Sequence, residues 1–149
     1  LSVARSGDSD NNASCVLLVE ARGRRFLLPG DIDDRRERAL VAYWREALRA
    51  DVLLAPHHGS GSSSSHLFLR SVAPGFLVVT AARANHFGHP ADGVLERAAR
   101  RDITVLNTAF AGAIEFRVDA RGVLHCRRYR HALAPFWRSG AGRRDCGEG

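Results

Sequence analysis

The chain has 149 residues, 45% hydrophobic and 26% charged, which suits one globular domain with an ordinary core. Its net charge is +6 and all 22 basic residues are arginine, a set that fits phosphate binding and equally fits a GC-rich genome. No apolar run approaches the roughly 20 residues of a membrane span. The polar start, LSVARSGDSD, does not resemble a signal peptide.

The first structured part of the chain is predicted to be a β-hairpin. Residues Cys15–Glu20 and Arg25–Leu28 are rich in Val, Leu and Phe, which favours strands. Arg22, Gly23 and Arg24 between them predict the turn.

An amphipathic helix is predicted over Arg35–Arg49, where apolar residues recur at helical spacing. Asp33 or Asp34 can cap its start. The predicted inner face consists of Ala39, Leu40, Tyr43, Trp44, Ala47 and Leu48. We expect Leu40 and Trp44 to be buried.

Three further apolar segments predict buried strands: Asp51–Ala55, Phe76–Thr80 and Thr104–Leu106. A short helix capped by Ser64 or Ser65 is expected after the first, and Pro90 opens another helix before the third. The inner faces of these two helices are predicted to hold Leu67, Phe68 and Val72 in one, and Val94, Leu95, Ala98 and Ala99 in the other.

A closing hairpin is predicted around Asp119–Gly122, between the stretches GAIEFRV and GVLHCRRYR. Strands that alternate with helices, with hairpins at both ends, indicate a layered α/β or α+β fold. We expect one domain over residues 1–134, followed by a loose Gly/Arg-rich tail over residues 135–149.

The three cysteines are Cys15, Cys126 and Cys146. Their odd number and wide spacing exclude a disulfide framework and a zinc knuckle. Cys15 lies in a strand-like run and is predicted to be a small core residue. A disulfide between Cys126 and Cys146 stays open at this point.

Chemically useful side chains follow three of the predicted strands. Asp31 lies in LLPGDID, His57 and His58 lie in APHHGS, and His86 and His89 lie in ANHFGHP. Strand ends that a rigid sheet holds in place are where α/β folds position their sites. One carboxylate with several imidazoles is a ligand set that suits Zn²⁺ or Mn²⁺.

Each of these features also has a simpler interpretation when it is taken alone. Asp31 fits a cap of the next helix, and the His57–His58 pair fits one packed and one solvated histidine. His89 before Pro90 fits a helix N-terminus. The recurrence of such residues at the same end of one sheet favours a shared site. The histidines outside this pattern, His66, His125 and His131, are interpreted as surface or packing residues.

The stretches NNASCVLLVEARGRRFLLPGDID, ADVLLAPHHGSGSSSS, NHFGHP and VLNTAFAGAIEFRV occur in this order. Together they resemble the metallo-β-lactamase-like domain at the C-terminus of ComEC-type DNA-internalisation competence proteins. The resemblance covers roughly residues 11–118, and the order GD, PHHGS, GHP is its specific part. It implies a four-layer αββα sandwich with a metal centre at the sheet edge, of which this chain is the C-terminal half.

The resemblance also implies roles for individual residues. Asp31 matches the family's bridging aspartate, His57 and His58 match the PHHGS histidines, and His89 matches the histidine of GHP. Asp31, His57 and His89 are then the expected metal ligands, with His58 beside them or also a ligand. Asp31, His57 and His58 are the expected catalytic residues. The implied cofactor is a divalent metal, Zn²⁺ or Mn²⁺, with two ions in the complete domain and no small-molecule cofactor.

The function implied by the resemblance is metal-dependent hydrolysis of the DNA strand that is not transported during transformation. The expected partners are DNA, as single strand or duplex and without sequence preference, and the membrane channel of the same or a longer protein. The domain is then expected at the inner membrane on the periplasmic side, outside the cytoplasm.

This sequence lacks the HxHxDH motif that usually supplies several ligands in metallo-β-lactamase-like domains. Either that half lies outside the chain or the protein lacks it, so we expect the chain alone to bind metal weakly. Two alternatives stay open. One is a catalytically silent DNA-binding or scaffold domain of the uptake channel, and the other is a stand-alone metallo-hydrolase of small substrates.

Overall fold

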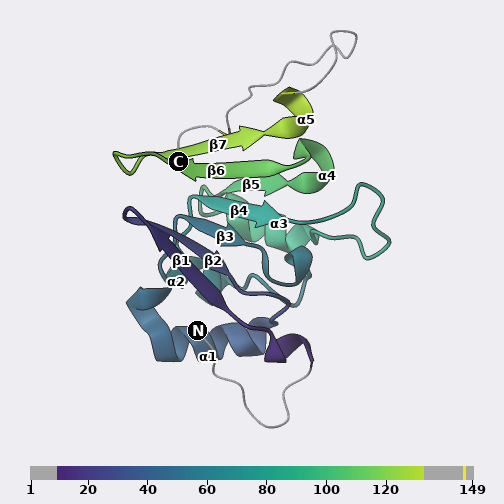
Figure 1. Cartoon of the computed structure of the whole chain (residues 1–149). Coiled ribbons are helices and arrows are strands. Elements are labelled where there is room, and N and C mark those ends of the chain that lie inside the picture. The colour runs from purple at the N-terminus through teal and green to yellow at the C-terminus, as the bar shows by residue number, and fades with distance from the viewer. Residues whose placement is uncertain (1–9, 133–145, 147–149) are drawn as a thin grey trace.

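The structure, a computed structural model, describes residues 10–132 and Cys146 (Figure 1). Its centre is a five-stranded sheet in the order β1-β2-β3-β4-β5. The strands are β1 (Leu17–Ala21), β2 (Arg24–Leu28), β3 (Val52–Leu54), β4 (Phe76–Val79) and β5 (Thr104–Asn107). β1 and β2 form the predicted antiparallel hairpin, and β2 to β5 are parallel to their neighbours. The mixed α/β (α+β) class predicted from the sequence is confirmed.

Helices cover one face of this sheet (Figure 1). They are α1 (Asp34–Trp44), the 3-10 turn η2 (Arg45–Leu48), α2 (His66–Val72) and α3 (Asp92–Ala99). The main core lies between them and the strands, where Leu27, Leu53 and Leu77 meet Leu40 and Phe68, and all five side chains are fully buried. As predicted, Asp33 caps α1 and Ser65 caps α2.

The predicted inner face of α1 is partly wrong. Leu40 is fully buried and Trp44 is half-buried, but Tyr43 is 69% exposed. Arg36 and Glu37 are buried instead, so the fully buried residues of α1 lie in its first two turns. The cause is a polar contact of Glu37 that the hydrophobic pattern does not encode. The helix also ends at Trp44, because Arg45 adopts a left-handed backbone with φ of 44°.

Two smaller predictions are also corrected. Cys15 precedes β1 and is exposed, so it is not a core residue. In α3, Val94 and Ala98 are buried as predicted, but Leu95 and Ala99 face solvent. The buried face of α3 is therefore narrower than predicted.

The opposite face of the sheet is covered only in part. A two-stranded hairpin, β6 (Ile114–Val118) and β7 (Leu124–Arg128), packs there as predicted around its turn. Phe116 lies against Phe26 and Phe76, with ring centroids 6.2 and 5.4 Å apart. A second buried cluster under the hairpin consists of Val52, Phe76, Val78, Leu106 and Cys146. Cys146 forms a disulfide with Cys126 of β7, which answers the question left open by the sequence. Apart from Cys146, the predicted tail lies outside the described residues.

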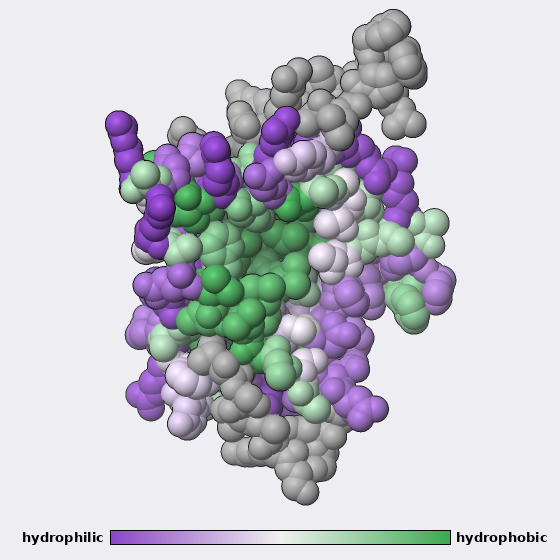
Figure 2. Space-filling model, viewed as in Figure 1, coloured by the Kyte–Doolittle hydropathy of each residue, from purple (hydrophilic) through white to green (hydrophobic). Residues whose placement is uncertain are grey.

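The β1–β2 side of this second face is open. Leu17, Val19 and Leu28 are 54%, 40% and 37% exposed, and the strand alternation places all three on the face away from the helices. Figure 2 shows a continuous hydrophobic area in the middle of this view. Among the described helices, none has the length and apolar character needed to cross a membrane.

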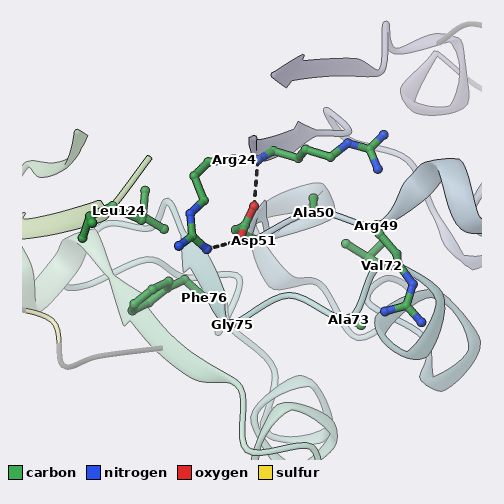
Figure 3. A pocket seen from close by; sticks show the side chains of 11 residues that line it. Arg24, Arg49, Ala50, Asp51, Val72, Ala73, Gly75, Phe76 and Leu124 are labelled. Carbon is green, nitrogen blue, oxygen red and sulfur yellow. Dashed lines mark hydrogen bonds and ion pairs between the residues drawn. The ribbon is translucent and has the colours of Figure 1, made fainter. Parts of the chain in front are cut away.

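A pocket of about 570 Å³ lies at the amino-terminal ends of β3 and β4 (Figure 3). Its polar centre is Arg24, whose Nη1 donates to Asp51 Oδ1 at 2.9 Å and whose Nε donates to Gly122 O at 2.9 Å. The other oxygen of Asp51 accepts from the backbone N–H of Arg25 at 2.8 Å. This network joins the β1–β2 hairpin, the start of β3 and the β6–β7 turn. It therefore acts as a structural clamp at the edge opposite to the candidate site.

We predict that Asp51→Ala lowers the free energy of unfolding by about 1–2 kcal/mol. The variant loses a partly buried carboxylate that accepts one hydrogen bond from the Arg24 guanidinium and one from the backbone N–H of Arg25. The control Glu46→Ala removes a carboxylate that is 86% exposed and pairs with Arg49, and should change stability by at most about 0.5 kcal/mol. Urea unfolding measures both. Equal losses in the two variants would show that the clamp is no more than a surface pair.

Candidate functional site

The carboxyl ends of β2, β3 and β4 lie at one edge of the sheet, because these strands are parallel. Asp31 follows β2, His57 and His58 follow β3, and His89 lies in the segment after β4. The backbone N–H of His57 donates to Gly30 O at 3.1 Å, which ties the first two loops together. The sequence prediction that these loops share one edge is therefore confirmed.

Asp31 is held at this edge by a tight backbone turn. Gly30 has φ of +68°, and a Cβ on it would lie 2.7 Å from Ser14 Cβ, so no other residue fits without displacement. The N–H of Asp31 donates to Ser14 Oγ at 3.1 Å. Asp33, not Asp31, accepts the N–H groups that begin α1. The simpler interpretation of Asp31 as the helix cap is therefore wrong, and its carboxylate is left for another role.

His57 and His58 both adopt left-handed backbone conformations, with φ of 48° and 56°. Two consecutive non-glycine residues in this region are strained, which is a feature found at functional sites. Nδ1 of His58 lies 2.9 Å from both Thr80 O and Thr80 Oγ1. Because a carbonyl oxygen only accepts, Nδ1 carries the proton and donates it there.

The other ring nitrogen of His58 consequently faces a carboxylate. Its Nε2 lies 3.8 Å from Asp31 Oδ1, and the two side chains are about half exposed, at 51% and 46%. Nε2 and the carboxylate oxygen are both groups that can bind a cation placed between them. Two bonds of roughly 2.0–2.2 Å to one ion span such a separation.

His89 lies beside His57, with ring centroids 5.9 Å apart. Its Nδ1 is buried and has no hydrogen-bond partner among the described residues. Burial lowers the pKa of His89, and the neighbouring His57 and His58 lower it further. The lowered pKa favours the neutral ring, which is the form that binds metal.

The predicted site residues thus meet as two pairs, Asp31 with His58 and His57 with His89. The chemistry of this donor set fits Zn²⁺ or Mn²⁺. Within residues 10–132 and Cys146, no three such side chains form a group that could hold an ion by themselves.

The serine run Ser62–Ser65, which looks like a flexible loop in the sequence, is firmly held. Both carboxylate oxygens of Glu37 accept backbone N–H groups, from Ser64 at 2.5 Å and Ser65 at 2.9 Å. From the other side, Arg97 of α3 donates to the carbonyls of Ser63 and Ser64. Burial raises the pKa of Glu37, and the N–H groups of the loop partly offset this.

The serine run in turn fixes the residue before the histidine pair. Ser63 Oγ, itself buried, donates to Pro56 O at 2.7 Å. Gly59 (φ +82°) lets Pro90 approach, since a Cβ on it would lie 2.9 Å from Pro90 Cβ. Sequence reasoning missed Glu37, Thr80 and Ser63, and no local signal marks them, because each acts across a long separation in the chain.

Of the other histidines, His125 is 3.0 Å from Asp119 on the β6–β7 hairpin, which forms a sheet of its own. This hydrogen bond holds the pKa of Asp119 at about 2. His66 begins α2 and is exposed. Both agree with the interpretation as surface residues, whereas the side chain of His131 lies outside what the structure describes.

We predict that Glu37→Gln lowers the free energy of unfolding by about 1–3 kcal/mol, because an amide can accept only one of the two N–H groups. The control Glu96→Gln changes a carboxylate that is 67% exposed on α3 and should be near neutral. Amide hydrogen exchange at Ser64 and Ser65 should become faster in the first variant alone. Unchanged exchange there would mean that Glu37 does not hold the loop.

Similarity to known proteins agrees with the motifs. The chain is 39% identical over 119 residues to "Competence protein ComA" of Neisseria gonorrhoeae, which covers 80% of this chain and 17% of that protein. It is 34% identical over 113 residues to "ComE operon protein 3" of Bacillus subtilis, covering 76% and 14% of the two chains. It is 35% identical over 106 residues to "Recombination protein 2" of Haemophilus influenzae, a match that covers 71% of this chain and 13% of that protein.

The chain thus spans about a sixth or less of the length of these relatives. No protein-family model matches it. Neither the metallo-β-lactamase-like character nor a metal follows from these similarities. What they do support is that this chain corresponds to one segment of a ComEC-type competence protein.

Proposed function

We propose that the chain is the C-terminal half of a metal-dependent DNA hydrolase domain in a protein for DNA uptake. The activity would be cleavage of the strand that is not transported, without sequence preference. The observation that carries the proposal is the pairing of His58 Nε2 with Asp31 Oδ1 at 3.8 Å, with His58 Nδ1 fixed on Thr80. The names of the relatives, two of which refer to competence or its operon, add the biological setting.

The residues of this edge divide the work by their chemistry. Asp31 supplies negative charge that attracts cations, and the Thr80 contacts aim the free nitrogen of His58 at the same place. His89, whose pKa is lowered, is suited to ligation, while His57 beside it can pass a proton to the leaving oxygen. Bound divalent ions would polarise the phosphate and activate the attacking water. The remaining ligands would come from a part of the domain that this chain does not contain.

The open apolar face supports the same proposal. A soluble domain rarely exposes neighbouring Leu and Val side chains across two strands, such as Leu17, Val19 and Leu28. Sheets that pack face to face bury such a surface at a spacing of about 10 Å. A second sheet on this face would complete the αββα sandwich that the resemblance implies, and would bring the missing ligands to the same edge.

We predict that Asp31→Asn abolishes Mn²⁺- or Zn²⁺-dependent DNA cleavage in a form that includes any residues encoded upstream of Leu1. The loss should exceed the roughly 10- to 100-fold typical of changes beside a metal ligand, because a ligand charge is removed while the shape is kept. Asp34→Asn is the matched control. Its side chain is 47% exposed, against 46% for Asp31, and it pairs with Arg38 away from the histidines.

Two results would decide between the alternatives. A form that loads metal and leaves DNA intact but hydrolyses a small phosphoester or lactam would be a stand-alone metallo-hydrolase. A form that binds DNA and loads no metal would be a silent scaffold.

We also predict that Leu17→Asn and Leu28→Asn destabilise a longer form of the protein more than they destabilise residues 1–149 alone. In residues 1–149 alone each should change stability by about 1 kcal/mol or less, since both side chains are already partly exposed, at 54% and 37%. In the longer form each should lower it by about 1.5–3 kcal/mol, the value of a fully buried leucine. Thermal unfolding measures both, and equal small effects in the two contexts would argue against a second sheet on this face.

A further inference from the structure

The segment between β4 and α3 projects beyond the edge of the sheet that carries the histidines (Figure 1). Arg83, His86 and Phe87 of this segment are exposed, and Phe87 is 70% exposed. An aromatic ring this open contributes little to folding. Its presence beside a candidate site therefore calls for a functional explanation.

The segment is nevertheless held in a defined conformation. The side chain of Asn85 accepts from the N–H of His89 and donates to its carbonyl, both at 2.8 Å. Thr108 Oγ1 contacts both the N–H and the carbonyl of Ala81 at its base, and the N–H of Ala91 donates to Gly59 O. Phe87 is thus presented on a scaffold that is tied to the histidine loop.

The exposed ring also belongs to an aromatic stack. Phe87 lies 4.1 Å from His86 between ring centroids, and 5.9 Å from His89 with an interplanar angle of only 19°. The plane of Phe87 is therefore nearly parallel to that of a candidate metal ligand. A flat group stacked on Phe87 would lie close to the site proposed for phosphodiester cleavage.

The same segment also carries a cation, which nucleic-acid binding needs in addition to an exposed aromatic ring. Arg83 has no acidic partner among the described residues, and its guanidinium is free to contact a phosphate. Sites for single-stranded nucleic acids combine cations along the backbone with exposed aromatic rings on which bases stack. Duplex DNA keeps its bases stacked within the helix and offers no free face to such a ring.

We propose that Phe87 is a stacking platform for an unpaired nucleobase, and that Arg83 holds an adjacent phosphate. The platform positions single-stranded DNA at the histidine edge and gives it preference over duplex. This inference rests on the proposed function and names the substrate form that the site takes.

A lipid surface fits the segment less well. Phe87 is flanked by polar or small residues, Asn85, His86 and Gly88, so one ring alone could enter a membrane. Interfacial membrane segments expose a broad apolar face instead.

The test measures binding of residues 1–149 to two single-stranded oligonucleotides, one with bases and one abasic, by fluorescence anisotropy at fixed salt. Phe87→Ala should weaken binding of the first by about 5- to 150-fold and leave the abasic strand unchanged. Phe87→Trp should retain affinity. Phe87→Leu should behave as Phe87→Ala, because it keeps apolar area without an aromatic plane. Arg83→Gln should weaken binding to both strands. It should also lower the slope of log affinity against log salt concentration by roughly 0.7 per lost phosphate contact.

Tyr43→Ala is the matched control, since Tyr43 is 69% exposed but lies on α1, and it should leave both affinities unchanged. The inference is overturned if Phe87→Ala binds the base-containing strand like the wild type. It is also overturned if duplex is preferred, or if Phe87→Ala loses only binding to anionic lipid vesicles. If Asp31-dependent cleavage of DNA persists in those cases, the proposed function survives. Phe87-dependent binding by a protein that never cleaves DNA would overturn the proposed function alone.

Discussion

The buried carboxylate of Glu37 is the contact on which the candidate site depends. It accepts hydrogen bonds from two backbone N–H groups of the serine run. Ser63 of that run donates to the carbonyl of Pro56, directly before the histidine pair. A buried charge is tolerated only when its oxygens are satisfied, so the loop cannot move without exposing an unpaired carboxylate. The strained backbone of His57 and His58 is held by this constraint.

The sheet supplies the second constraint. Parallel strands end at a common edge, so three loops far apart in sequence bring Asp31, the histidine pair and His89 together. Among the described residues, these side chains do not form a group of three that could hold an ion. In the part of the chain that the structure describes, helices cover one face of this sheet, and the β6–β7 hairpin packs with Cys146 on the other.

The polar groups at this edge differ in how far they extend from the sheet. Asp31 and His58 are anchored at strand ends, close to rigid backbone. Phe87 and Arg83 lie on the projecting segment, which Asn85 ties back to His89. Rigid groups near the sheet suit chemistry that needs fixed geometry, whereas an exposed arm suits capture of a flexible strand.

The sequence alone determined the order of strands and helices, the caps at Asp33 and Ser65, and the placing of Asp31 and the histidines at strand ends. These features are encoded locally, by apolar periodicity and by residues that end strands. The inner face of α1, the firmness of the serine run and the exposure of Cys15 followed only from tertiary structure. Glu37, Ser64 and Arg97 are distant in sequence, and a buried carboxylate there resembles any glutamate on a solvated helix until its partners are in place. The pairing of Asp31 with His58 likewise needed the loops to be folded, because its geometry is set by contacts that Thr80 and Gly30 make across neighbouring strands.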